Sequence, residues 1–125
     1  MTIDFTKSER KTIRKLAALA WERQLRSELH KIAAAIADMD KEVLSPFEVN
    51  QKIHDFHNGV SRKLFRLYSD SQPWFSVCRA HYDRVLNDDD VMGASDNIRN
   101  GIREFAKNFA YFYELDIHGD LQEDG

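Results

Sequence analysis

The stretch from Ser45 to Tyr68 constrains the fold most, because a strong helix start is followed there by apolar residues at helical spacing. Ser45 can accept a hydrogen bond from an amide of the first turn, and Glu48 can reach back to the Ser45 amide. Pro46 falls at the first helical position, where its missing N–H costs nothing. Apolar residues then recur every three or four positions and predict one apolar helix face. These residues are Val49, Ile53, Phe56 and Val60.

Asn58 and Gly59 predict the end of this helix, because glycine tolerates the left-handed backbone of a helix C-terminus. Ser61 would then cap a short further helix that carries Leu64 and Tyr68. The alternative is one continuous helix that keeps Gly59 inside it, at a cost of roughly 1 kcal/mol relative to alanine. We favour the break.

The run over residues 53–65 resembles a segment of short bacterial proteins that are entirely helical and to which no activity is attached. The resemblance covers only this central part of the chain. It implies a helical fold and a bacterial source, and it implies no ligand, partner or reaction.

A second capping pattern, from Thr6 to Glu9, opens a long predicted helix that runs to about Lys41. From Trp21 onward, its apolar residues step close to the 3.5-residue repeat of helices that pack nearly in parallel. These residues are Trp21, Leu25, Leu29, Ile32, Ile36, Met39 and Val43.

The first part of this predicted helix has a different apolar face. Its centre lies roughly 140° round the helix from the later stripe, at 100° per residue. No proline or glycine lies nearby to bend the helix between the two faces. We therefore expect a second contact surface over the early face, supplied by the C-terminal segment or by another subunit. The early face consists of Ile13, Leu16, Ala17 and Ala20.

Two more helices complete the predicted fold. Pro73 starts a helix that extends to about Asn87, and Ser95 or Asp96 caps the last one. We predict an all-α helical bundle of four to five helices with a long N-terminal helix. A single helical domain would cover residues 1–116, and residues 117–125 would form an acidic, flexible tail.

The last helix is rich in aromatic residues, each of which can remove some 150–250 Å² from water. Core packing accounts for such residues, and the alternative is an interface. Together with the early face of the first helix, we predict this helix as a contact surface for a protein partner or for a second copy in a homodimer. The predicted interface residues are Ile13, Leu16, Ala20, Phe109, Tyr111 and Phe112.

Three histidines are candidate metal ligands. His54 and His57 are three residues apart, so they are neighbours on a continuous helix, and His81 borders the apolar side of the next helix. Three imidazoles with an open fourth position are a ligand set of catalytic zinc. The sequence lacks the Glu-x-x-His and His-Glu-x-x-His motifs of known metal sites, so structural histidines at the edge of a core are the competing interpretation.

Composition bounds the remaining classes of function. The one cysteine, Cys78, cannot form an intramolecular disulfide, and its apolar neighbours predict a buried, inert thiol. No apolar run approaches the ~20 residues that span a bilayer, so we expect a cytoplasmic protein. A net charge of −3 and the lack of a helix-turn-helix argue against nucleic acid, although the first helix is basic. Arg62, Lys63 and Arg66 could receive an anion near a helix start at Ser61.

The chain contains no glycine-rich phosphate loop, nucleophile elbow or dinucleotide fingerprint. We therefore expect a non-catalytic protein–protein interaction or adaptor module that needs no cofactor. The alternative is a metal-binding or small-ligand-binding bundle that uses His54, His57 and His81.

Overall fold

The computed structural model of the chain describes residues 4–69 and 72–124, with side chains up to residue 110. Every element of these residues is helical, which confirms the predicted all-α fold and its long N-terminal helix. The elements are α1 (Lys7–Asp40), α2 (Pro46–Phe56), the π-helical turn η1 (His57–Ser61), α3 (Arg62–Ser69), α4 (Pro73–Tyr82), α5 (Asp88–Val91) and α6 (Asp96–Asp124).

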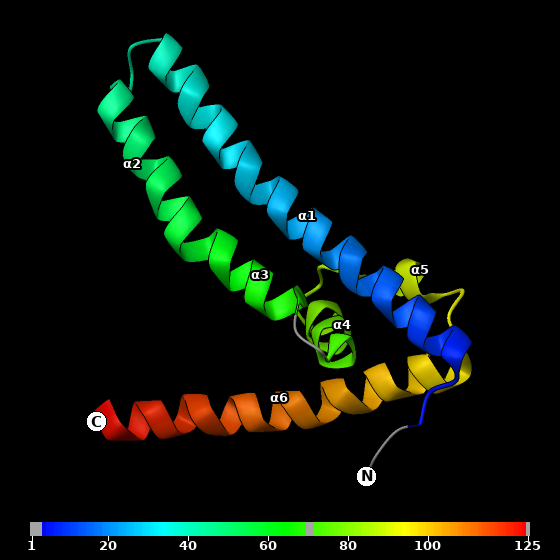
Figure 1. The fold of residues 1–125 in the computed structure, drawn as a ribbon. Coiled ribbons are helices and arrows are strands. Elements are labelled where there is room, and N and C mark those ends of the chain that lie inside the picture. The colour runs from blue at the N-terminus through cyan, green and yellow to red at the C-terminus, as the bar shows by residue number, and fades with distance from the viewer. Residues whose placement is uncertain (1–3, 70–71, 125) are drawn as a thin grey trace.

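Two long helical arms form an antiparallel hairpin (Figure 1). The first arm is α1, and the second runs without interruption through α2, η1 and α3. The N-terminal part of α1 packs mainly on α4, which in turn packs on α6. We call this packed part the body, and we call residues 25–56, which project away from it, the distal hairpin.

The start of α1 is tied to the start of α6 through one carboxylate. The Thr6 amide donates to Glu9 at 2.9 Å, and the Glu9 amide donates to the Thr6 hydroxyl at 3.1 Å, so the predicted capping box forms. The Ser95 hydroxyl also donates to Glu9 and accepts from the Ile98 amide, which caps α6 as predicted. The Ser95 hydroxyl and the Thr6 amide hold the pKa of Glu9 below its usual value.

The body has a core in which the early face of α1 is fully covered. Ile13, Leu16 and Ala20 are 2%, 6% and 0% exposed, and they pack with residues of α3, α4 and α6. The chain's own helices thus cover this face, and a partner contact at these three residues stays a prediction. The core consists of Ile13, Leu16, Ala17, Ala20, Leu64, Tyr68, Val77, Cys78, Ala80, Leu86, Val91, Ile98 and Ile102.

A partly buried ion pair between Arg23 and Asp90 holds α1 where it leaves the body. The Arg23 guanidinium donates to both carboxylate oxygens of Asp90, at 2.6 and 2.8 Å, and to the Val85 carbonyl at 2.9 Å. The hydrogen bonds from Arg23, and then the one from the Asn87 amide, lower the pKa of Asp90 to about 2. Such a bidentate arrangement fixes orientation as well as distance, so it sets the direction in which the distal half of α1 projects.

The helix does not break at Gly59, so the predicted stop there is wrong. Residues 57–61 form one π-helical turn inside a continuous arm, and no described glycine has a positive φ. Gly59 therefore follows the alternative, in which the helix tolerates glycine inside it. The predicted cap at Ser61 does not form either, since that residue lies within the arm. Ser45, by contrast, caps α2 with Glu48 as predicted.

Two helices end differently from the predictions. α4 stops at Tyr82 instead of near Asn87, because Arg84 adopts a φ of 64° and the Val85 amide donates back to the Ala80 carbonyl at 2.8 Å. Asn87 instead caps the short α5. α6 continues as a helical backbone through residues 117–124, for which a tail was predicted. No helix in the described residues is long and apolar enough to span a bilayer.

The continuous arm predicts the effect of replacing Gly59. A Cβ atom at this position would meet nothing within 4 Å, and the backbone is helical. Gly59→Ala should therefore raise the free energy of unfolding by about 0.5–1 kcal/mol, because alanine loses less backbone entropy on folding. Urea denaturation measures the change. Gly93→Ala, outside any helix, is the control and should gain less; a destabilised Gly59→Ala would instead support a helix stop.

The Arg23–Asp90 pair predicts a specific pH dependence. The pKa of Asp90 is lowered from 3.8 to about 2, so the pair stabilises the fold above about pH 4 and loses this effect as the pH falls toward 2. Asp90→Asn should therefore unfold at lower urea concentration than the parent protein at pH 7, and the difference should shrink at about pH 2.5. Asp89→Asn, an exposed change in the same helix, is the control. An equal difference at both pH values would contradict the assignment.

Candidate interaction surface

The distal hairpin buries very little of its own apolar surface. Among residues 25–56, only Ala35 and Val49 are buried. Both are small enough for two helices to enclose between them, and larger apolar residues on either arm stay partly or fully accessible. Two helices alone cannot form a closed core, so an apolar face of this size is left without a covering layer within the described chain.

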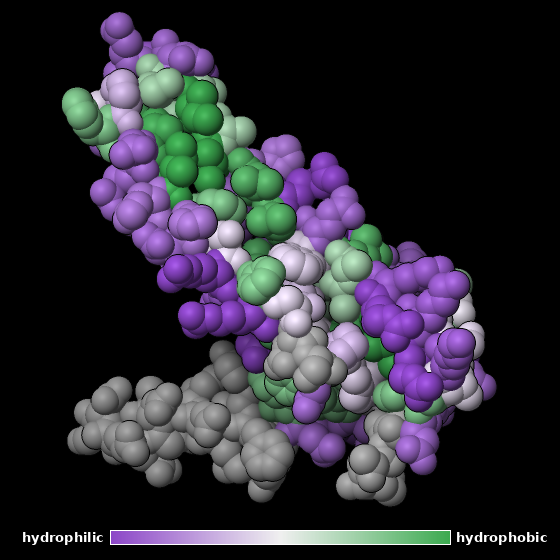
Figure 2. All heavy atoms as spheres, in the orientation of Figure 1, coloured by the Kyte–Doolittle hydropathy of each residue, from purple (hydrophilic) through white to green (hydrophobic). Residues whose placement is uncertain are grey.

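Three exposed apolar residues of the distal hairpin lie on one side of it, and the more exposed Val43 and Phe47 lie at its tip. Leu29 and Ile36 lie two turns apart on α1 and are 47% and 41% exposed, and Ile53 of α2 is 42% exposed. Phe65, 59% exposed, extends the same side toward the body, where its ring meets Trp21 edge-on at 6.0 Å. Figure 2 shows hydrophobic surface gathered along the hairpin, from its tip toward the body. We call Leu25, Leu29, Ile36, Ile53 and Phe65 the open face.

The open face is not flat. A hollow of about 420 Å³ runs along its α1 edge, lined by Leu25, Leu29 and Ala33 together with Glu22, Arg26 and His30. The charged residues of this edge are already paired, since Arg26 donates to Glu22 at 2.7 Å. Side chains of a partner could therefore enter the hollow without leaving a buried charge unpaired.

The opposite side of the hairpin differs in chemistry. A hollow of about 500 Å³ lies between the arms there, and its rim carries charged residues. The apolar Ile32 and Phe56 form part of this hollow and are half-buried. Because the rim stays well hydrated, the hairpin has one apolar side and one charged side. The charged residues of the rim are Glu28, Lys31, Asp38, Lys52 and Asp55.

The structure does not bring the three candidate histidines together. His54 lies in α2 and His57 begins η1, both on exposed positions, whereas His81 lies in α4. The Asn58 amide donates to Nε2 of His54 at 2.9 Å, and Nε2 of His81 lies 3.0 Å from the Asp88 carboxylate. No three His, Cys, Asp or Glu side chains of the described residues form a metal-binding group. Zinc binding stays a prediction, which elemental analysis of untreated protein can test.

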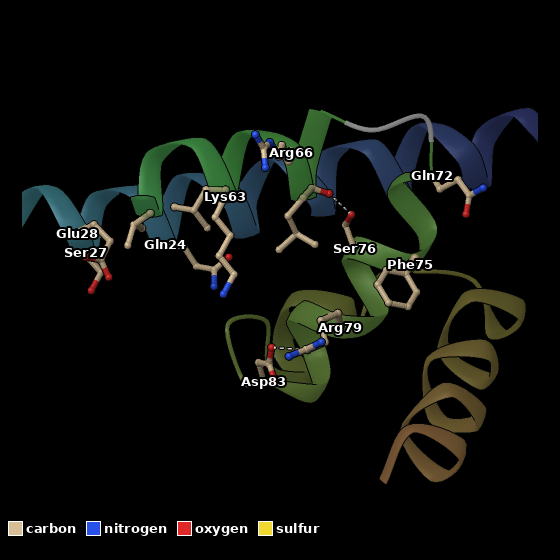
Figure 3. A pocket seen from close by; sticks show the side chains of 13 residues that line it. Gln24, Ser27, Glu28, Lys63, Arg66, Gln72, Phe75, Ser76, Arg79 and Asp83 are labelled. Atoms are coloured by element: carbon tan, nitrogen blue, oxygen red, sulfur yellow. Dashed lines mark hydrogen bonds and ion pairs between the residues drawn. The ribbon is translucent and has the colours of Figure 1, made fainter. Parts of the chain in front are cut away.

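A hollow of about 740 Å³ lies where α1, α3 and α4 meet (Figure 3). Lys63 and Arg66 line it, but Arg62 does not, and no helix starts at Ser61 to complete the predicted anion site. Arg79 within the hollow is paired with Asp83 at 2.8 Å. The mixed charge of the lining gives no group of convergent donors for one anion.

Two ionisable groups of the core, Tyr68 and Cys78, are held in neutral form. Tyr68 donates to the Gln24 side chain at 2.5 Å, and burial raises the pKa of its hydroxyl to about 12. Burial also raises the pKa of Cys78 to about 12, and the thiol is only 1% exposed. The prediction of a buried, inert thiol at Cys78 is confirmed.

The aromatic residues of α6 are only partly described. The Phe109 ring stacks on Phe105 at 5.4 Å, meets Tyr82 edge-on at 4.7 Å, and lies under the Arg79 guanidinium at 4.8 Å. Phe109 thus packs on the body and is half-buried there. The side chains of the other two predicted contact residues of this helix, Tyr111 and Phe112, lie outside the described residues.

Sequence reasoning found the residues of the open face but did not predict their exposure. The stripe from Trp21 to Val43 was expected to pack against other helices of the bundle, and the early face was expected at an interface. The structure reverses the two on α1: its early face is enclosed, and Leu29 and Ile36 of its later stripe are exposed. The length of the second arm was the available signal, since a hairpin of two long arms offers no third helix to cover the stripe.

Comparison with models of protein families, with curated proteins and with solved structures found no match for this chain.

Proposed function

We propose that this protein is a non-catalytic protein–protein interaction module that binds its partner through the open face of the distal hairpin. The observation that supports the proposal is the exposure of Leu29, Ile36, Ile53 and Phe65 along one side of two rigid helices. Contiguous exposed apolar residues with a polar border are typical of protein contact sites.

The energetics favour a bound state of this face. Full burial of one Leu, Ile or Phe side chain is worth about 1.5–3 kcal/mol, and the open face offers several such side chains that are roughly half exposed. The helical arms are already formed and capped, so little backbone entropy is lost on binding. A preorganised apolar surface of this kind binds helices of another protein.

Features of the body also support contact formation as the protein's role. The hollow between α1, α3 and α4 contains paired charges, and the one cysteine is buried with a raised pKa. A reducing compartment such as the cytoplasm suits a chain whose one thiol is unpaired. These features support an adaptor role more than that of an enzyme.

Site-specific photo-crosslinking in cells that produce the protein tests the proposal. A photo-reactive amino acid in place of Ile36 or Ile53 should give covalent adducts with protein, because the partner would cover both positions. The same residue in place of Met92, which is 63% exposed on the body, is the matched control and should give none. Mass spectrometry identifies the adducts, and a second copy of the chain counts as a protein partner.

Two results would contradict the proposal. One is the absence of protein adducts at positions 36 and 53 under conditions in which the probe reacts with solvent. The other is an adduct pattern at position 92 that matches the pattern at the open face.

A further inference from the structure

We propose that the open face binds the open face of a second copy of this chain, with the two hairpins antiparallel so that the tip of each lies beside the base of the other. The inference rests on the proposed function and names its partner. The two hairpins would face each other and form a four-helix bundle. Charge, helix geometry and area each support it.

The hairpin is electrically polar along its length. Its tip, residues 38–48, contains four acidic residues and one lysine, namely Asp38, Asp40, Glu42, Glu48 and Lys41. The base of its second arm, residues 57–69, contains Arg62, Lys63 and Arg66 and no acidic residue. The charged side chains of both groups are accessible or half-buried.

This polarity selects one arrangement of two copies. If two hairpins faced each other in parallel, acidic tip would meet acidic tip and basic base would meet basic base, which is unfavourable. The antiparallel arrangement places each acidic tip beside a basic base, and it does so twice, because a two-fold axis repeats every contact. The axis would cross the open face near its middle, between Leu29 and Ile36.

The spacing of the apolar residues fits helices that cross at a small angle. In α1, the open-face residues Leu25, Leu29 and Ile36 follow one another at steps of four and seven residues. This repeat keeps one apolar stripe facing the same side over several turns, as in bundles whose helices cross at about 20°. Two hairpins that face each other supply the four helices of such a bundle.

The area of the distal hairpin is sufficient for a dimer. At 1.5 Å per residue, the 16 residues from 25 to 40 of α1 span about 24 Å, and two adjacent helices are about 20 Å wide. The flat footprint is therefore on the order of 500 Å² per copy, and accessible area exceeds it because side chains stand out from the helices. Stable interfaces begin at roughly 1,200 Å² over both partners, so two hairpin faces of this size come close to that lower limit.

Sedimentation of the purified full chain tests whether the open face pairs with itself. We expect a species of twice the 14.6 kDa chain mass that dissociates on dilution. Ile36→Lys should raise the dissociation constant by roughly tenfold or more, because it would bury a charge at the centre of the contact. Met92→Lys is the matched control: Met92 is 63% exposed on the body, outside the hairpin, so its replacement should change little.

Charge exchange tests the orientation. Asp40→Lys with Glu42→Lys makes the tip basic, and Arg62→Glu with Arg66→Glu makes the base acidic. Each double variant alone should dimerise several-fold more weakly at low salt, and an equal mixture of the two should recover the parent affinity, because both tip–base contacts are again opposite in sign. All four positions are exposed, so folding should be preserved, as circular dichroism can verify.

The outcomes separate this inference from the proposed function. A monomer at every concentration would overturn the dimer, while photo-crosslinks from positions 36 and 53 to a different protein would leave the proposed function intact. A dimer that tolerates Ile36→Lys would overturn the choice of face. A mixture of charge variants that stays weak would overturn the antiparallel arrangement.

Discussion

The structure depends on one straight helix that carries apolar residues on two different sides. Because α1 does not bend, it cannot turn both sides toward the same neighbours. Its first half is covered by α3, α4 and α6, and the Arg23–Asp90 pair then holds the helix at the edge of the body. The second half therefore leaves the body with only α2 beside it. In the distal hairpin, Ala35 of α1 and Val49 of α2 are the residues that this contact buries. The open face follows from this rigidity.

Much of the fold could be predicted from local chemistry. The capping boxes at Thr6 and Ser45 form as the sequence indicated, and Ser95 caps the last helix. Such motifs are local, because donor and acceptor lie three residues apart, so no tertiary information is needed to find them. The apolar periodicity of α1 likewise identified both of its faces correctly.

The role of each face could not be predicted in the same way. Periodicity shows that a side of a helix is apolar, but it does not show which segment covers that side. Ile13 and Leu16 are enclosed because α4 returns across α1, an arrangement that depends on the turn at Arg84 and on the path of α6. The histidines illustrate the same limit, since His81 is placed by α4 and lies against Asp88 instead of facing His57.

The π-helical turn over residues 57–61 determines which side of α2 faces α1. In a regular α-helix, Tyr68 would lie about 100° away from Val49, since the nineteen residue steps from one to the other complete five turns and part of a sixth. The extra residue of a π-helical turn removes about this angle, so both residues can face α1, where both are buried. The body holds α3 through Leu64 and Tyr68. Deletion of one residue here would therefore rotate α2 about its own axis by about 100°. Ile53 would turn away from α1, while α3 and the body stayed in place.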